Sequence, residues 1–289
     1  MQISVIVTCY NAHTTLAVAL ESVTAQSTPP HEIIIVDDGS TDDSVAIARS
    51  VIPAATIIEQ RNQGVSAARN AGLAHVNGDV IAFLDDDDVW HPTKLERQIR
   101  LLEQHPQLDL VATRWSRTSP IPRQDWSLRW LSYRDLTLMN QFQTSTVLMR
   151  SQLAAEVGGF DSKLDTVEDW AFWIACAKKG TLAVLEQDLV LYRDSPDGVS
   201  KDLHRFWATL ERMIHTTDAM ALLDPTDRER IIAWHVQRML VAALLQRDLS
   251  LLVKITFRGL RVSPIAQLHA TRTLTIPFLT ERLRRRREI

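Results

Sequence analysis

The chain has 289 residues, of which 45% are apolar and 23% are charged, and these proportions exclude a disordered or collagen-like protein. Two cysteines, Cys9 and Cys176, are too few for a disulfide-stapled scaffold, and no Cys/His spacing is typical of zinc. No apolar run reaches the roughly 18 residues of a membrane span, and the first residues lack the basic start of a signal peptide. We therefore expect a cytoplasmic protein.

The net charge of −3 conceals an uneven distribution along the chain. Residues 1–224 contain 30 acidic and 19 basic side chains, a balance of −11. Residues 225–289 contain 5 acidic and 13 basic side chains, a balance of +8. This asymmetry predicts an acidic body followed by a basic region that has its own partner.

The first third of the chain alternates apolar, β-branched runs with helix-like segments. The runs predict strands at 3–8, 32–38, 55–60 and 79–86, and a segment such as 64–76 predicts a helix. Near-continuous apolar strands separated by helices are typical of a parallel sheet covered on both faces. The sequence therefore predicts an α/β fold.

After residue 105 the alternation weakens. Residues 108–113 and 144–150 predict further strands, and 168–180 predicts a helix. Residues 114–130, which are rich in Trp, Arg and Pro without any period, predict a loop. From about residue 201 apolar residues recur at three- and four-residue spacing, as in helices. The predicted domains are an α/β domain at 1–200 and a helical extension with a basic tail at 201–289.

Polar side chains follow three of the predicted strands at their carboxyl ends. Ligands of open α/β sheets bind at this edge, so these residues form the candidate site. They are Thr8, Tyr10 and Asn11 after the first strand, Asp37 to Ser40 after the second, and Asp85 to Asp88 after the fourth.

The four consecutive aspartates at 85–88 have two interpretations. An acidic loop in solvent would need no ligand. At the end of a strand, however, alternate carboxylates point the same way and can share a hard divalent cation with phosphate oxygens. Their position at the edge of the sheet favours the metal.

Three other segments are ambiguous on spacing alone. VDDGSTD at 36–42 is either a turn or the place where a carboxylate accepts an N–H from a nucleobase. Arg69, within NQGVSAARNAG at 62–72, is either a surface cation or a phosphate partner. VEDW at 167–170 either stabilises the start of a helix or supplies a general base.

Taken together, the segments closely resemble family 2 glycosyltransferases in order and spacing over roughly residues 1–200. The resemblance implies a GT-A fold, which is Rossmann-like with a mostly parallel sheet. It also implies a nucleotide-diphosphate sugar donor, a Mg²⁺ or Mn²⁺ ion and inversion at the anomeric carbon. The segments that carry it are SVIVTCYN (4–11), VDDGSTD (36–42), NQGVSAARNAG (62–72), GDVIAFLDDDDVW (78–90), and GGFD with EDW (158–170).

The same resemblance assigns roles to individual residues. Asp169 matches the catalytic base, and Asp37 matches the residue that binds the nucleobase, usually uracil. The DxD motif falls on Asp85 and Asp87, which would hold the metal, with Asp86 between them. The nucleotide-sugar contacts implied in this way are Thr8, Tyr10, Asn11, Asp37, Arg69, Asp85 and Asp86.

The chain departs from the family pattern in three places. Thr8-Cys9 stands where the first strand usually ends in Pro-Thr, and Ala171 replaces the second aspartate of EDxDLW. In YRDSPDGVS, Ser195 occupies the position of a histidine that usually lies near the metal. The last departure leaves open which residue completes the metal's ligands.

The expected function is that of a metal-dependent, hexosyltransferase-like enzyme that inverts configuration. It would move a sugar from a UDP- or dTDP-sugar to the hydroxyl of a glycan or lipid-linked acceptor in cell-envelope or extracellular polysaccharide synthesis. One alternative is an inactive sugar-nucleotide-binding protein. Another is a nucleotidyltransferase, but that class is expected to have a Gly-rich, basic loop after strand one, where this chain has CYNAHTT.

Two segments suggest further partners. Trp115, Trp126 and Trp130 either stack on an acceptor sugar or anchor their own loop. The terminal arginines are either a solvated tail or a peripheral anchor on the inner face of the cell membrane. Nucleic acid is not expected, because the charge of −11 on the body opposes a polyanion. The arginines are Arg282, Arg284, Arg285, Arg286 and Arg287.

Overall fold

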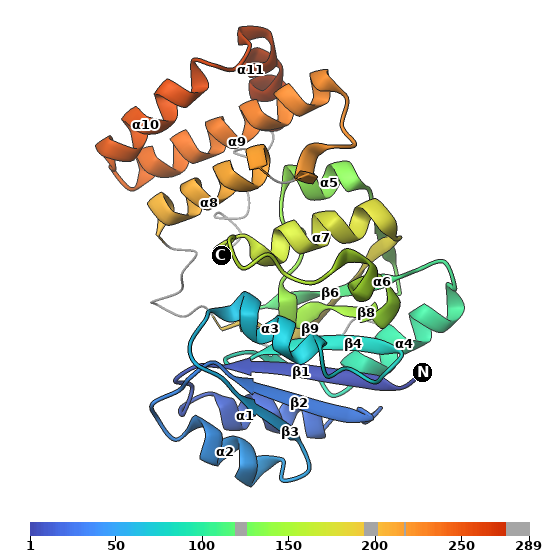
Figure 1. Cartoon of the computed structure of the whole chain (residues 1–289). Helices are drawn as coiled ribbons and strands as arrows, with labels where there is room; N and C mark the ends of the chain where they lie inside the picture. Colours follow the sequence, from blue (N-terminus) through green and yellow to red (C-terminus); the bar gives the residue numbers. More distant parts are fainter. Residues whose placement is uncertain (119–125, 194–201, 217, 276–289) are drawn as a thin grey trace. The chain divides into compact units, whose positions relative to one another are not determined.

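The computed structural model describes residues 1–118, 126–193, 202–216 and 218–275. The chain divides into two compact units, drawn in Figure 1. The first unit comprises Met1–Leu136 and Asn140–Gly198, and the second comprises Thr137–Met139 and Val199–Ile289.

The first unit is built on one mixed sheet with the strand order β3-β2-β1-β4-β8-β6-β9-β5. Its first four strands run parallel: β3 (Thr56–Glu59), β2 (Glu32–Asp37), β1 (Ile3–Cys9) and β4 (Val80–Asp85). β8 (Leu148–Arg150) runs antiparallel to both β4 and β6 (Leu110–Ser116). β9 (Leu182–Leu191) runs parallel to β6 and antiparallel to β5 (Val89–Trp90) and β7 (Leu128–Leu131).

Helices cover both faces of this sheet (Figure 1). On one face, alternate β1 residues such as Val5 and Val7 join a core with Leu16 and Leu20 of α1 and with Leu95 of α4. The opposite face of the sheet is covered by α3 and α7. The helices of this unit are α1 (Leu16–Thr24), α2 (Ser44–Val51), α3 (Val65–Leu73), α4 (Lys94–Gln104), α6 (Ser151–Val157), α7 (Glu168–Lys179) and most of α5 (Tyr133–Leu138), whose last two residues belong to the second unit.

The second face is packed with aromatic rings. Phe83 of β4 meets Trp173 of α7 edge-on, with ring centroids 6.4 Å apart. Gly72 of α3 lies so close to Ile6 of β1 that a Cβ there would come within 2.6 Å of the isoleucine side chain. The absence of a side chain at Gly72 therefore lets α3 lie close to the sheet. The helices on both faces of the sheet confirm the predicted α/β fold.

The loop prediction for 114–130 is wrong at both ends. β6 continues to Ser116, and β7 forms at Leu128–Leu131, while residues 119–125 lie outside the described residues. The sequence pattern fails at β7 because its two middle residues, Arg129 and Trp130, are both exposed, so the alternation of apolar and polar residues is lost.

The second unit is helical, as expected for the C-terminal region. Its helices are α8 (Leu203–Thr216), α9 (Pro225–Leu245), α10 (Leu249–Gly259) and α11 (Pro264–Ala270), with a 3-10 turn at Asp218–Met220 and a π-turn at Thr271–Thr275. Asp224 caps α9 by accepting the N–H groups of Thr226 and Asp227, and Pro225 takes the first helical position. No helix in the described part of the chain combines the length and apolarity needed to cross a membrane.

Candidate active site

The strands β1, β2 and β4 end together at one edge of the sheet. Cys9 pairs with Asp37 of β2, and Thr8 pairs with Asp85 of β4, in parallel register. This register brings together the predicted site residues of three separate motifs. Thr8 is buried between its neighbours, whereas the ring of Tyr10, two residues further on, is exposed.

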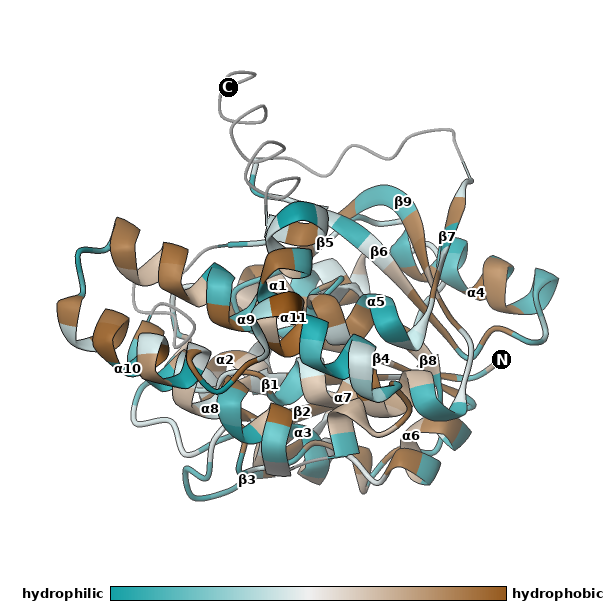
Figure 2. Ribbon diagram, turned by 90° about the horizontal axis from the view of Figure 1, so that it is seen from above, coloured by the Kyte–Doolittle hydropathy of each residue, from teal (hydrophilic) through white to brown (hydrophobic). Residues whose placement is uncertain are grey.

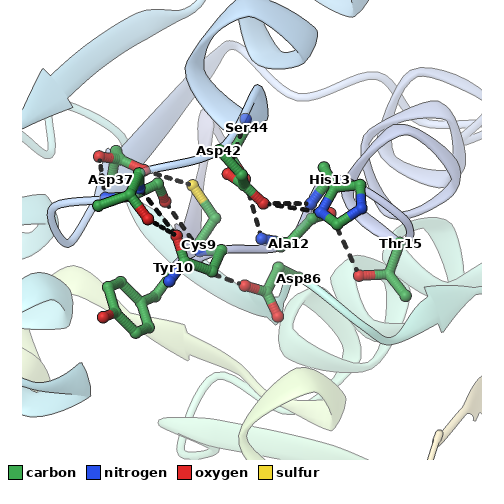
Figure 3. Close-up of polar contacts among 12 residues, drawn as sticks. Cys9, Tyr10, Ala12, His13, Thr15, Asp37, Asp42, Ser44 and Asp86 are labelled. Carbon is green, nitrogen blue, oxygen red and sulfur yellow. Dashed lines mark hydrogen bonds and ion pairs between the residues drawn. The ribbon is translucent and has the colours of Figure 1, made fainter.

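The loop after β1 is fixed by side chains that accept from its backbone (Figure 3). The Tyr10 N–H donates to Asp86 at 3.0 Å, and the Asn11 N–H donates to the Ser40 hydroxyl at 2.9 Å. The next N–H, that of Ala12, donates to the Ser44 hydroxyl at 2.8 Å. The predicted sugar-nucleotide residue Asp86 therefore ties the end of β4 to the end of β1.

Asp37 is only 3% exposed, and one of its carboxylate oxygens accepts hydrogen bonds from the backbone that follows it. Its Oδ2 accepts the N–H groups of Gly39 and Ser40, at 3.2 and 3.0 Å. Its Oδ1 lies 3.7 Å from the Sγ of Cys9. Burial and then the charge of Asp37 raise the pKa of the Cys9 thiol, which stays protonated and acts as a weak donor. Oδ1 is thus the atom of Asp37 suited to accept a stronger donor.

Asp38 has a structural role that the motif did not reveal. Its Oδ1 accepts from the side chain of Gln60 at 2.7 Å, and its Oδ2 accepts the Gly64 N–H at 2.8 Å. Gly39 follows with a φ of +81°, and a Cβ there would lie 2.8 Å from the backbone nitrogen of Asn62. Asp38 and Gly39 together hold the β3–α3 loop against the end of β2.

The four aspartates diverge at the end of β4. Asp85 ends the strand, and the Asp88 N–H closes a turn onto its carbonyl oxygen at 3.2 Å. Asp88 is buried, and its Oδ1 accepts the Arg193 N–H at 3.1 Å. The cluster is therefore partly internal, and the alternative of an acidic loop in solvent does not describe it.

Burial raises the pKa of the next three aspartates. Removal from water is the first cause in each case, and repulsion from Asp85 adds to it. The pKa values rise to about 7 for Asp86, about 6 for Asp87 and about 8 for Asp88. Full ionisation of this cluster near neutral pH is therefore disfavoured without a cation to balance it.

This donor set fits a hard divalent cation. Mg²⁺ is commonly held by one or two carboxylates together with substrate phosphates, and Asp85 and Asp87 suit that pattern. Within the described ranges, no three His, Cys, Asp or Glu side chains are grouped as a metal site.

Arg69 of α3 is buried at the centre of the site. Its guanidinium donates to Asp85 at 2.8 Å and to Glu168 at 2.9 Å, and it lies 5.3 Å from the ring centroid of Phe160. Burial alone would lower the pKa of Arg69, but the two carboxylates outweigh it and the pKa is raised. Arg69 is thus a fixed internal cation, and the surface alternative is wrong.

Asp169 and Glu168 begin α7 beside this arginine. Burial raises the pKa of Asp169, although Arg69 opposes the shift, and Asp169 accepts from the side chain of Asn140 at 2.9 Å. Burial and repulsion from Asp169 raise the pKa of Glu168 to about 7, against the effect of Arg69. Arg69 thus links the predicted metal ligand Asp85 to Glu168, the residue next to the predicted base.

Asn70 joins two motifs that are separate segments in the sequence. Its side-chain nitrogen donates to the Phe160 carbonyl and its Oδ1 accepts the Phe160 N–H, both at 2.8 Å. Gly159 has a φ of +89°, and a Cβ there would lie 2.5 Å from the Asn70 Oδ1. The ARN and GGFD segments therefore form one unit that holds Phe160 against Arg69. In the sequence, this pairing is indicated by the Asn that follows the motif arginine and by the Gly-Gly pair before Phe160.

The three tryptophans of the predicted acceptor region do not gather at the site. Trp115 pairs with Val190 of β9, whereas Trp130 pairs with Ala183, seven residues and about 23 Å away along the strand. Trp115 contacts Tyr192, with ring centroids 5.1 Å apart, near the end of β9 that pairs with β5. Trp130 packs on His105 instead, and Trp126 lies against the guanidinium groups of Arg97 and Arg100. Ser195 lies outside the described residues.

Solved structures with this architecture include two complexes with nucleotide sugars. TarS of S. aureus in complex with UDP-GlcNAc aligns with a TM-score of 0.68 and 19% identity, over 88% of this chain and 79% of that chain. Mannosyltransferase PcManGT from Pyrobaculum calidifontis, in complex with GDP-Man and Mn²⁺, aligns with a TM-score of 0.62 and 18% identity, over 93% of this chain and 83% of that chain. At this identity the likeness establishes the GT-A-like fold, which confirms the predicted fold class.

Sequence similarity extends the finding. The uncharacterized glycosyltransferase YwdF of Bacillus subtilis (strain 168) is 31% identical over 218 residues, which cover 70% of this chain and 79% of that protein. Residues 4–155 match the family described as Glycosyl transferase family 2. The matched region contains the ends of β1, β2 and β4 together with Arg69, and this chain belongs to glycosyl transferase family 2.

Proposed function

We propose that the chain is an inverting, metal-dependent, hexosyltransferase-like enzyme. It transfers a sugar from a UDP- or dTDP-sugar to the hydroxyl of a glycan or lipid-linked acceptor, in cell-envelope or extracellular polysaccharide synthesis. The bridge from Arg69 to Asp85 and Glu168 is the observation that carries this proposal. It couples the carboxylates of the donor side to the start of α7, where Asp169 lies.

On the donor side, Asp37 supports the choice of nucleobase. Uracil and thymine offer one N–H between two carbonyl groups. The Oδ1 of Asp37 suits that N–H, because the Cys9 thiol that it contacts is only a weak donor. The two structural neighbours carry UDP-GlcNAc and GDP-Man, so the shared fold does not select the base. Thr8, Tyr10 and Asn11 would then face the nucleoside from the fixed loop after β1.

Asp85 and Asp87 would hold Mg²⁺ or Mn²⁺ together with the diphosphate. When bound, such an ion supplies positive charge that stabilises the departing diphosphate. Arg69 fixes Asp85 through its hydrogen bond and keeps positive charge beside the nucleotide. Asp86 keeps its structural contact with the loop after β1 in this arrangement.

On the acceptor side, Asp169 acts as general base. It takes the proton of the acceptor hydroxyl while that oxygen attacks the anomeric carbon from the face opposite the diphosphate. The bond to the diphosphate breaks as the new glycosidic bond forms, so the configuration inverts. Burial raises the pKa of Asp169, and a base is most effective when its pKa approaches the working pH. Of the three tryptophans, we assign Trp115, which contacts Tyr192, to stacking on the acceptor sugar.

The two alternatives have less support. An inactive binding protein would not need the buried, like-charged pair of Glu168 and Asp169, which is costly to maintain without a chemical role. A nucleotidyltransferase is expected to surround the triphosphate with basic groups after strand one. In this chain the loop after β1 instead meets the carboxylates of Asp42 and Asp86.

The test is a panel of sugar nucleotides with Mg²⁺ or Mn²⁺. Donor hydrolysis and transfer are measured for the wild type, Asp169→Asn and Asp79→Asn, a matched control that removes the same charge at the amino end of β4. We expect turnover in the wild type and control only, with proton NMR showing inversion at the anomeric carbon. A retained anomeric configuration, or turnover by Asp169→Asn, would overturn the mechanism. Binding without turnover in all three would favour the inactive protein.

A further inference from the structure

Helix α10 carries two apolar stripes on opposite sides. Leu251, Ile255 and Gly259 are buried, and α10 packs on α9. Leu249, Val253 and Phe257 are offset from that stripe by two positions, or about 200° at 3.6 residues per turn. They are 75%, 56% and 67% exposed. A helix held by one apolar side thus presents a second one to solvent in the described part of this unit.

The exposed stripe continues beyond the end of the helix. Leu260, which directly follows α10, is 75% exposed and falls on the same side by helical spacing. We call Leu249, Val253, Phe257 and Leu260 the α10 apolar face. Figure 2 colours much of α10 as hydrophobic along this part of the chain. Single exposed apolar residues are ordinary, but a contiguous row of four large ones marks an interaction surface.

The segment that carries this face is rich in basic residues. Residues 246–275 contain five basic residues and one acidic residue, a balance of +4. Lys254 lies about 100° around the helix from Val253 and is exposed. The single acid, Asp248, accepts the Leu251 N–H at 2.9 Å and contacts His204 at 2.7 Å, so it is occupied inside the unit. The basic residues are Arg247, Lys254, Arg258, Arg261 and Arg272. Arg258 is engaged within the unit, because it pairs with Glu211 of α8 at 3.0 Å.

We infer that the α10 apolar face binds the surface of an anionic lipid bilayer. The four apolar side chains would enter the boundary between headgroups and acyl chains, and the neighbouring basic residues would meet the lipid phosphates. A second copy of the chain would bring two regions of charge +4 together, which disfavours a symmetric dimer through this face. A fluid bilayer also accommodates protruding side chains without a shaped groove.

The experiment is co-sedimentation of the full chain with vesicles of phosphatidylcholine containing 30% phosphatidylglycerol. Pure phosphatidylcholine vesicles are the reference. The variant combines Leu249→Ser with Phe257→Ser. Its control combines Leu222→Ser with Val18→Ser, which removes two exposed apolar residues elsewhere. We expect the α10 variant to lose at least tenfold in partition coefficient, and the control to stay within twofold. Circular dichroism and thermal unfolding verify that both variants fold.

A second variant tests the charge separately. Lys254→Glu should weaken binding to the anionic vesicles severalfold and leave binding to pure phosphatidylcholine unchanged. Equal binding by the wild type and the α10 variant would overturn the inference. So would a dimer, seen by sedimentation equilibrium without lipid, that the α10 variant abolishes, because the occupant would then be a second copy. None of these readouts depends on sugar transfer, so the inference and the proposed function can fail independently.

Discussion

The side chain of Asn140 donates a hydrogen bond of 2.9 Å to the carboxylate of Asp169. The other oxygen of that carboxylate accepts the Trp170 N–H at 2.6 Å. The proposed base is therefore held at both oxygens, in a place where burial raises its pKa and the Asn140 hydrogen bond lowers it. Asn140 is thus a positioning residue that also adjusts the basicity of Asp169.

Asn140→Ala should lower kcat about tenfold, because a hydrogen bond to a charged group contributes about 1.5–3 kcal/mol. Because the Asn140 hydrogen bond lowers the pKa of Asp169, its loss should raise that pKa. The acidic limb of the kcat profile should consequently move to higher pH, while KM for the donor stays the same. Asn77→Ala, in an exposed loop, is the control. A reduced kcat with an unmoved pH profile would mean that Asn140 only supports packing.

Asp169→Asn and Asp87→Ala should separate the two halves of the reaction. Loss of the base should reduce transfer by about 10² to 10⁴-fold and leave nucleotide affinity nearly unchanged. Asp87→Ala should instead weaken metal-dependent binding of UDP, measured by calorimetry with and without Mn²⁺. If Asp169→Asn loses UDP binding and keeps turnover, the assignment of the base is wrong.

The sequence predicted the parallel half of the sheet well because β1, β2 and β4 are buried on both faces and read as continuous apolar runs. It failed at β7, where the middle residues are exposed, and it gave no strand at β9. Contacts between motifs were also hidden. The reciprocal hydrogen bonds between Asn70 and Phe160 join residues 90 positions apart, and no local pattern encodes such a distance. The same limit explains why Arg69 and Asn140 acquire their roles only in three dimensions.

UDP and dTDP should stabilise the protein more than GDP or CMP do. The reason is the Oδ1 of Asp37, which suits the single N–H of uracil or thymine. A thermal shift series at equal nucleotide concentration, with Mn²⁺ present, measures this preference. A ligand at a hundred times its dissociation constant adds about 2.7 kcal/mol to the free energy of unfolding. A larger shift with GDP would contradict the assignment of Asp37.

The second unit should lose stability at acidic pH because His235 is buried in it. The His235 Nε2 lies 2.8 Å from the Thr137 carbonyl, which fits an N–H donor, and its Nδ1 accepts from Arg238 at 3.0 Å. Burial and then Arg238 lower its pKa well below the ordinary value of about 6.5. At pH values between the lowered pKa of His235 in the folded protein and about 6.5, the unfolded chain binds more protons than the folded chain does. The free energy of unfolding therefore falls as pH drops below about 6.5.

Urea unfolding at pH 7.5 and 5.5 measures that loss. His235→Gln, which keeps a donor for the Thr137 carbonyl but does not titrate, should lose less free energy of unfolding between the two pH values than the wild type. His75→Gln, at an exposed position, should behave like the wild type. An equal loss in all three proteins would show that other groups control the acid response.

The terminal arginines should add a salt-sensitive component to lipid binding. Arg282 and Arg284–Arg287 lie outside the described residues, so the prediction rests on charge alone. Each basic residue near an anionic surface contributes about 1 kcal/mol, and screening removes that contribution as salt rises. A chain ending at Thr280 should therefore bind anionic vesicles more weakly than the intact chain at low salt and equally at high salt. The residual binding should still depend on Leu249 and Phe257, because apolar insertion is not screened. Equal binding by both chains at low salt would leave the tail as a solvated segment, and stronger binding by the shortened chain would mean that the tail covers the α10 apolar face.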